Sequence, residues 1–266
     1  MANNYERYFV PAIFEPWATD LLNLVPPQES DRVLDLACAT GIVARLASKQ
    51  VGPTGKVVGL DLNPAMLAIA RSAAPTDALL EWQQGNAEDM PFPDEAFDLV
   101  LCQQGLQFFP NKDVALREMH RVVAPGGRLA LSVWCDIQRI PGYAALAEAL
   151  ARHAGPEAAG FMQMTGSVSA EQLKNLFQAS DFQEVHIRSK SRTLRFSSAE
   201  AFVWEMVQCT PLAWMASVNQ ADESTRATVV NELLAKLQPY LQDGGLTFPI
   251  EASVATAQKA GVRKDA

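Results

Sequence analysis

The sequence predicts an α/β fold in which helices cover a mostly parallel β-sheet. The main observation is alternation, because short β-rich apolar runs take turns with helical stretches over the first half of this 266-residue chain. A second observation is that these runs are apolar on both faces, which is typical of parallel strands buried between helices. The third is a turn of small residues directly after the first run, at 37–41. In such sheets, ligands bind outside the carboxyl ends of the strands.

The elements of the first half follow in order along the chain. Strands are predicted at 32–36, 56–61, 80–83, 97–102 and 128–134. A first helix is predicted at 42–48. Asn63 and Pro64 suit the N-cap and first position of a second helix. Apolar residues at helical spacing between Ala115 and Val123 predict a third helix, which ends before the turn at 125–127.

The second half changes character. Ser169 with Gln172, and Ser197 with Glu200, have the spacing of capping boxes at the starts of two helices. A further helix is expected at 222–241, and two strand-like runs lie at 185–196 and 246–258. We expect a single Rossmann-like domain over 1–266, with helical cap elements at approximately 1–20, 136–168 and 197–243.

Composition limits the classes of function. Hydrophobic residues make up 48% of the chain, charged residues 20%, and the net charge is −8. An acidic chain of this kind argues against a protein that grips a nucleic-acid backbone. Four cysteines lie far apart with no CxxC pair, which favours reduced thiols. We find no secretory signal and no apolar run long enough to span a membrane. The sequence therefore predicts a cytoplasmic protein with no membrane span and no metal site.

The turn after the first strand is the strongest candidate for a ligand site. Asp35 precedes it, and the small residues at 37–41 allow the backbone to approach a ligand closely. A dinucleotide site would need G-x-G-x-x-G, whereas this loop has one glycine and an acid that suits an ammonium group. Asp61 ends the second strand, where such folds place an acid that accepts hydrogen bonds from ribose hydroxyls. The alternatives are a tight turn with a structural aspartate at 35 and an ordinary capping acid at 61.

Five segments resemble, in order and spacing, the motifs of class I S-adenosylmethionine (SAM)-dependent methyltransferases. The segment 33–41 resembles motif I, usually D-x-G-C-G-T-G, and 58–67 resembles the segment that follows it. Residues 85–92, Gly-Asn-Ala-Glu-Asp-Met-Pro-Phe, are similar to the stretch that holds adenine. The segments 97–102 and 123–129 match the two remaining core motifs. The likeness covers roughly residues 30–135 and is closest to the branch with the ubiquinone and menaquinone C-methyltransferases and many small-molecule methyltransferases.

The resemblance implies a fold, a cofactor and a set of site residues. The fold is a Rossmann-like, mostly parallel sheet of seven strands, one of them antiparallel. The cofactor is SAM, with S-adenosylhomocysteine (SAH) as product. The residues implied for the cofactor are Asp35, Ala37, Cys38, Ala39 and Gly41 for the methionine portion, Asp61 for the ribose, Leu62, Met66, Asn86, Ala87 and Glu88 around adenine, and Gln103 near the methionine tail or the sulfonium.

Two departures from the family pattern concern the cofactor loops. Alanine replaces glycine at 37 and 39, which we expect to require a negative φ there or a relaxed loop. Asn86 replaces the usual aspartate, so that it would offer an amide oxygen to the adenine amino group. Both departures are expected to permit binding, with weaker affinity.

Acceptor residues are predicted by position rather than by motif. Gln104, Gln107 and Phe108 follow the fourth strand, where this family exposes its acceptor site, or they form a polar loop capped by core aromatics. The aromatic N-terminal segment containing Tyr8, Phe14 and Trp17 either closes over the cofactor or packs on the core. Trp204 either lines an apolar acceptor pocket or belongs to the core of the cap.

The predicted function is transfer of a methyl group from SAM to an O, N or C atom of a small, partly apolar acceptor. The cofactor carries the leaving group, so the protein supplies mainly alignment, and the sequence nominates no general base. A non-catalytic SAM-binding module or scaffold is the alternative, and a nicotinamide-dependent oxidoreductase is a remote one. The expected partner is a small molecule, and the expected assembly is a monomer or homodimer.

Overall fold

The computed structural model describes residues 1–75 and 79–261, which form two compact units. Unit 1 consists of Met1–Ile13, Trp134–Ser169 and Lys190–Ala252. Unit 2 consists of Phe14–Val133, Ala170–Ser189 and Ser253–Ala266. The expected cap segments 136–168 and 197–243 fall within unit 1, whereas the segment 1–20 is divided after Ile13. The single-domain organisation stays a prediction.

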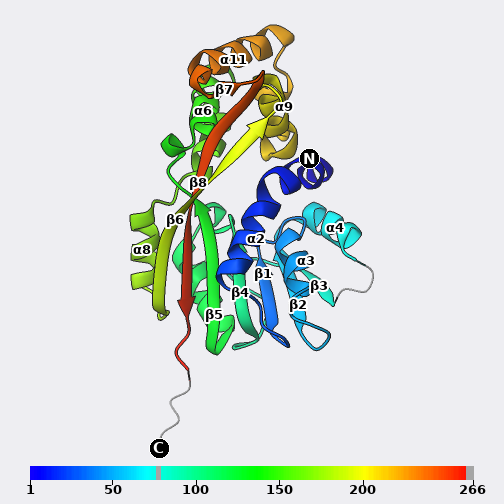
Figure 1. Cartoon of the computed structure of the whole chain (residues 1–266), viewed down its shortest axis with the longest axis vertical. Helices are drawn as coiled ribbons and strands as arrows, with labels where there is room; N and C mark the ends of the chain where they lie inside the picture. The colour runs from blue at the N-terminus through cyan, green and yellow to red at the C-terminus, as the bar shows by residue number, and fades with distance from the viewer. Residues whose placement is uncertain (76–78, 262–266) are drawn as a thin grey trace, which may run out of the picture. The chain divides into compact units, whose positions relative to one another are not determined.

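The sheet confirms the predicted fold class (Figure 1). Its strands in chain order are β1 (Arg32–Leu36), β2 (Lys56–Asp61), β3 (Leu80–Gln84), β4 (Phe97–Gln103), β5 (Val123–Trp134), β6 (Gln183–Phe196), β7 (Leu241–Gln242) and β8 (Gly245–Gln258). Their order in the sheet is β3-β2-β1-β4-β5-β8-β6, and the pairs among β1–β5 are all parallel. The carboxyl ends of β1, β2, β3 and β4 therefore meet at one edge.

The strand β8 runs antiparallel to β5. Gly126 N–H donates to the carbonyl oxygen of Lys259, whereas Cys135 N–H donates to that of Glu251, so the two chains run in opposite directions. The short strand β7 pairs antiparallel with β8 and adds an eighth strand to the seven expected. Asp243 and Gly244 join the two with φ values of 49° and 79°, the conformation that Asp-Gly favours in tight hairpins. This Asp-Gly pair was the signal for the extra strand.

Helices of unit 2 cover its part of the sheet. They are α2 (Glu15–Leu24), α3 (Ile42–Ser48), α4 (Pro64–Ala73), α5 (Lys112–Val122) and α8 (Ala170–Gln178), with a 3₁₀ turn η2 (Leu106–Phe108). As predicted, Asn63 caps α4, because its Oδ1 accepts a hydrogen bond from Ala65 N–H at 2.9 Å. The α2 and α3 helices contact each other, and their side chains at Leu21, Leu22, Val43 and Ala44 are buried with those of β1 and β4.

Unit 1 is mainly helical. It contains α1 (Ala2–Asn4), most of the π-helix η1 (Tyr5–Phe14), η3 (Ile137–Arg139), α6 (Pro141–His153), α7 (Pro156–Thr165), α9 (Ala199–Cys209), η4 (Pro211–Trp214), α10 (Ala216–Asn219), α11 (Glu223–Lys236) and η5 (Gln238–Tyr240). Its core includes stacked and edge-to-face rings of Phe196, Phe202 and Phe248. Gly142 of α6 lies so close to the ring of Phe248 that a Cβ atom would come within 2.2 Å of it.

Two predicted helix boundaries in unit 1 were wrong. Ser198, not Ser197, caps α9, since its hydroxyl accepts a hydrogen bond from Ala201 N–H at 3.1 Å. The helix α11 ends at Lys236 instead of 241, because Pro239 has no N–H to continue the α-helical pattern and the chain turns into η5. Asp222 caps α11 as the sequence indicates.

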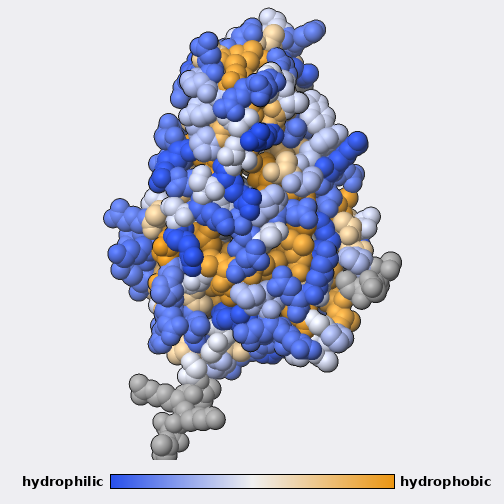
Figure 2. Space-filling view, in the orientation of Figure 1, coloured by the Kyte–Doolittle hydropathy of each residue, from blue (hydrophilic) through white to orange (hydrophobic). Residues whose placement is uncertain are grey.

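The surface is mainly hydrophilic on the face drawn in Figure 2, with apolar residues visible between the hydrophilic ones. Within residues 1–75 and 79–261, no helix is long and apolar enough to cross a membrane. All four cysteines are buried free thiols.

Candidate functional site

Asp35 lies at the carboxyl end of β1 and is 1% exposed. Its Oδ2 accepts a hydrogen bond from Ala44 N–H at 2.9 Å, and Ala44 lies in the first turn of α3. This contact fixes the start of α3 relative to β1. Burial raises the pKa of Asp35 to about 8, and the negative charge of Asp61 adds to the shift.

The loop that follows Asp35 has a left-handed backbone at three positions. The φ values are 57° at Ala37, 48° at Ala39 and 82° at Gly41. Of the two alternatives expected for these alanines, a negative φ or a relaxed loop, the structure contradicts the first. Tertiary hydrogen bonds impose this conformation, because Cys38 N–H donates to Leu60 O at 3.0 Å and Ala39 N–H donates to Asp61 Oδ2 at 2.8 Å. These bonds outweigh the cost of a left-handed alanine, about 1–2 kcal/mol each.

Asp61 joins the loops that follow β1 and β2. One carboxylate oxygen accepts from Ala39 N–H and the other from Asn63 N–H, both at 2.8 Å. Burial raises its pKa, while these two N–H groups act in the opposite direction. Each oxygen of a carboxylate has a second lone pair, so Asp61 retains acceptor capacity for a ligand hydroxyl.

Apolar side chains lie beside Asp61. Leu62 is 68% exposed, which is unusual for a large apolar side chain. Met66, one turn into α4, is half-buried. An exposed leucine next to a partly buried carboxylate gives this edge of the sheet an apolar surface and a hydrogen-bond acceptor side by side.

The segment after β3 carries Asn86, Ala87 and Glu88. Asn86 Oδ1 accepts from Glu88 N–H at 3.0 Å, and Ala87 is buried. Both carboxylate oxygens of Glu88 are engaged within the protein. They accept hydrogen bonds from Asn111 N–H and Asn111 Nδ2, each at 2.8 Å. These bonds lower the pKa of Glu88 and join this segment to the start of α5.

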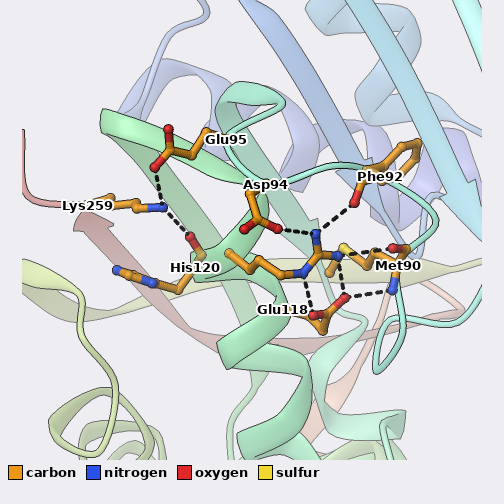
Figure 3. Close-up of polar contacts among 8 residues, drawn as sticks. Met90, Phe92, Asp94, Glu95, Glu118, His120 and Lys259 are labelled. Atoms are coloured by element: carbon orange, nitrogen blue, oxygen red, sulfur yellow. Dashed lines mark hydrogen bonds and ion pairs between the residues drawn. The ribbon is translucent and has the colours of Figure 1, made fainter.

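Arg121 of α5 holds the continuation of the same segment (Figure 3). Its guanidinium donates to both oxygens of Glu118, at 2.7 Å each, and to Asp94 Oδ1 at 2.9 Å. It also donates to the carbonyl oxygens of Met90 and Phe92. Glu118 in turn accepts from Met90 N–H at 2.8 Å. We call this group, Arg121 with Glu118 and the segment 90–94, the Arg121 clamp.

Polar side chains are buried where β4 and β5 end. Gln103 Nε2 donates to Phe14 O at 2.9 Å, while its Oε1 makes no hydrogen bond within the described chain. Gln104 is 5% exposed, has a φ of 54°, and neither amide atom of its side chain has a partner there. The hydroxyls of Ser132 and Thr40 are also buried without a hydrogen-bond partner in the described chain. Gln107 is buried on η2.

The remaining acceptor candidates divide between the two units. In unit 2, Trp17 is buried on α2 and Phe108 is 40% exposed on η2. In unit 1, Tyr8 contacts Trp204 edge-to-face with ring centroids 5.3 Å apart. Trp204, 47% exposed, lines a pocket of about 560 Å³ between α6, α9 and α11. Phe14 contributes its carbonyl oxygen to Gln103, as described above.

Sequence reasoning missed several residues that shape the site. Thr40, Ser132, Asn111 and Arg121 were not selected, although the first two lie inside or beside matched motifs. Arg121 with Glu118 has the i, i+3 spacing of a helix ion pair, which was the available signal. The contacts of Asn111 and Arg121 to the segment 86–94 join residues about 25 to 30 positions apart, and no local pattern indicates them.

Comparison with known proteins agrees with this geometry. Residues 34–131 match a family model described as a methyltransferase domain. The chain is 42% identical over 104 residues to the 2-phytyl-1,4-naphtoquinone methyltransferase of Synechococcus elongatus, which is 38% of this chain and 45% of that protein. The chain thus spans about half the length of the curated relatives it matches.

Solved structures share the fold. A putative methyltransferase from Bacillus halodurans superposes with a TM-score of 0.61 at 22% identity, covering 91% of this chain and 98% of that one. Phosphoethanolamine N-methyltransferase 2 of Haemonchus contortus, in complex with phosphomonomethylethanolamine and SAH, superposes with a TM-score of 0.57 at 18% identity, covering 92% and 52%.

The sheet order, the loop after β1 and the acid at the end of β2 define a class I methyltransferase fold. Residues 34–131 match the methyltransferase domain model, and about half the length of the related quinone methyltransferases resembles this chain.

Proposed function

We propose that the protein is a SAM-dependent methyltransferase that methylates an O, N or C atom of a small, partly apolar molecule. The observation that carries this proposal is the edge where β1 and β2 end. There the left-handed loop 37–41 is tied to Asp61, whose carboxylate retains lone pairs beside the exposed Leu62. The methyltransferase domain match supports it.

The residues present fit SAM. Asp61 would accept hydrogen bonds from the ribose hydroxyls, with Leu62 and Met66 along one face of adenine. The loop at 37–41 has no side chain larger than threonine, so its backbone can approach the amino-acid portion closely. Thr40 Oγ1 and Gln103 Oε1, buried without partners in the described chain, offer hydrogen bonds to a polar ligand end.

When bound, SAM supplies an activated methyl group on a sulfonium. The task of this chain is then to align the acceptor and to exclude water, rather than to activate a leaving group. We assign no general base, because the polar groups at the β4 edge are amides and hydroxyls.

A partly apolar ring is the acceptor class that the relatives favour. The Synechococcus elongatus relative is named for a naphthoquinone with a phytyl chain. We propose an acceptor of comparable character, handled in the cytoplasm by a monomer or homodimer, with no nucleic-acid partner.

Calorimetry with SAM and SAH tests this proposal. Asp61→Ala is expected to weaken binding by about 1–3 kcal/mol, since charged hydrogen bonds to ribose are lost. Asp61→Asn keeps one acceptor oxygen and should fall between the two. The control Asp113→Ala removes an exposed acid of α5 and should leave affinity unchanged.

Two results would speak against the proposal. Equal affinity of Asp61→Ala and the unchanged protein would remove the ribose assignment. Tight SAM binding without methylated product, across a panel of phenols, amines and quinols, would favour a non-catalytic SAM-binding module.

A further inference from the structure

Gln104 has an unusual environment for a glutamine. It is 5% exposed, and neither its Oε1 nor its Nε2 makes a hydrogen bond within the described residues. Leaving such groups buried and unpaired carries a desolvation cost that no hydrogen bond offsets. The φ of 54° adds strain, because a left-handed backbone is unfavourable for a residue with a Cβ. Strain and unpaired polar groups together are typical of a site that a ligand completes.

The sheet order places Gln104 away from the cofactor acids. Asp35 and Asp61 end β1 and β2, and the expected adenine segment follows β3. Gln104 follows β4, and its N–H donates to Ser132 O of β5 at 2.9 Å. In the order β3-β2-β1-β4-β5, the adenine end and Gln104 thus lie on opposite sides of β1. A group held by Gln104 would lie beyond the amino-acid end of the cofactor, where an acceptor must approach.

The loops after β1 and β4 are nevertheless in contact. A Cβ atom at Gly105 would come within 2.7 Å of the Ala37 Cβ and 3.0 Å of the Cys102 Sγ. Only a glycine at 105 therefore allows the loop with Gln104 to close against the cofactor loop. The loop that carries Gln104 therefore lies close to the loop 37–41, although the two loops follow different strands.

The chemistry of the unpaired groups defines what they can bind. A primary amide donates through Nε2 and accepts through Oε1, and the nearby Ser132 hydroxyl does both. No lysine or arginine is hydrogen-bonded to Gln103, Gln104 or Ser132 in the part of the chain described. A phosphate or carboxylate would remain without a cation there, at considerable desolvation cost. A neutral hydroxyl both donates and accepts, and it matches the amide.

We propose that Gln104 is a specificity-determining residue that binds a neutral hydroxyl group of the acceptor through its side-chain amide. This inference rests on the proposed methyltransferase function and narrows its acceptors to neutral hydroxyl-bearing rings of the phenol or hydroquinone class. The amide holds the hydroxyl and so orients the ring toward the donor methyl group. Phe108, partly exposed on η2 three residues after Gly105, adds an aromatic surface for such a ring.

The test uses the full chain saturated with SAH and three naphthalene probes. These are 1-naphthol, 1-methoxynaphthalene, which cannot donate, and 1-naphthoate, which is charged. Calorimetry is expected to rank 1-naphthol first. In Gln104→Leu the affinity for 1-naphthol should fall about tenfold, to that of 1-methoxynaphthalene, with the Kd of SAH within about twofold of the unchanged protein.

Stability separates a binding role from a structural one. Leucine has a shape similar to that of glutamine but no polar atoms, so Gln104→Leu should unfold at the same temperature as the unchanged protein or higher. A residue that only supports the fold would give a lower Tm. Gln178→Leu, an exposed position at the end of α8, is the matched control and should change neither probe affinity nor SAH affinity.

Each other result overturns the inference. No preference for 1-naphthol, or an unchanged 1-naphthol affinity in Gln104→Leu, would remove the hydroxyl assignment. An equal loss of SAH affinity would show that the amide serves the cofactor. A clearly lower Tm would make its role structural. Failure of the proposed function is distinguished by a separate measurement, in which the unchanged protein would bind neither SAM nor SAH.

Discussion

Two alanines carry the backbone strain of the loop at 37–41, which we propose binds the cofactor. Ala37 and Ala39 have φ values of 57° and 48°, where the related motif has glycine. The hydrogen bonds of Cys38 and Ala39 N–H to β2 hold the conformation that glycine would adopt without a Cβ penalty. At the scale of single residues, the loop thus keeps its shape through tertiary contacts rather than through its own preference.

Replacing Ala39 with glycine should relieve this strain. The left-handed penalty of about 1–2 kcal/mol is removed. The greater freedom of glycine in the unfolded chain offsets about 0.4–1 kcal/mol of the gain. We expect urea unfolding to show a net stabilisation of about 0.5–1 kcal/mol. Ala47→Gly, in the helical α3, is the control and should destabilise. A destabilised Ala39→Gly would mean that the methyl group packs more than it strains.

The pKa of Asp35 gives a second prediction at this scale. Burial raises the pKa from 3.8 to about 8, so between these values the folded protein holds a proton that the unfolded chain has lost. The free energy of unfolding should therefore fall as pH rises from about 4 to 8, by up to about 1.4 kcal/mol per pH unit, and level off above 8.

Asp35→Asn isolates this contribution. The amide oxygen can still accept from Ala44 N–H, and the variant has no proton to lose. The free energy of unfolding of both proteins is to be measured in urea from pH 5 to 9. The stability of Asp35→Asn relative to the unchanged protein should increase with pH up to about pH 8. A flat difference would mean that Asp35 is ionised throughout.

At the scale of elements, α5 positions the segment that follows β3. Asn111 at its start binds both oxygens of Glu88, and the Arg121 clamp near its end holds 90–94. The segment 88–94 is thus fixed to one helix at both of its ends, and Asn86 and Ala87 directly precede it. A loop that is to frame a planar ring benefits from such fixing, because less order has to be imposed on binding.

Breaking the Arg121 clamp should loosen this segment. Arg121→Met removes the donors to Glu118, Asp94 and two carbonyl groups, and leaves Glu118 partly buried without its partner. We expect a loss of about 1–3 kcal/mol in urea unfolding and faster amide exchange over 90–94. Lys56→Met, which breaks the exposed pair with Glu81, should cost less than about 1 kcal/mol. Unchanged exchange at 90–94 would contradict the clamp.

At the scale of the whole molecule, the chain forms two compact units with separate cores. The core of unit 1 contains Phe202 and Phe248, and that of unit 2 contains Leu21, Val43 and Leu101. The residues proposed to bind the cofactor all belong to unit 2, whereas Tyr8 and Trp204 belong to unit 1. The effect of a core substitution in unit 1 on stability can therefore be measured separately from its effect on ligand binding by unit 2.

Gly142→Ala tests the packing of unit 1. A Cβ atom would meet the Phe248 ring at 2.2 Å, so overpacking should destabilise the protein by about 1–3 kcal/mol. Gly160→Ala in α7 has open space around the new methyl group and should stabilise by about 0.5–1 kcal/mol through helix propensity. Thermal unfolding of both variants measures the difference. Equal Tm values would show that Phe248 moves aside without cost.

Much of unit 2 follows from local patterns. The predicted bounds 32–36, 42–48 and 56–61 agree with β1, α3 and β2, because buried strands and capped helices each have a short sequence period. Asp61 and Leu62 could be selected for the same reason, as the end of a strand is visible in the sequence. The helix boundaries of unit 1 were predicted less accurately, because its helices are stabilised by the packing of their faces in the core of that unit.

The sequence by itself determined the alternation of strands and helices and the set of small and acidic residues at one edge. Only the tertiary structure decided the left-handed alanines, the use of Glu88 by Asn111, and the burial of Gln104 without a partner. The physical reason is the sequence separation of the residues that interact. Periodicity and capping involve residues within a few positions, whereas hydrogen bonding, burial and strain depend on which distant segments come together in the fold.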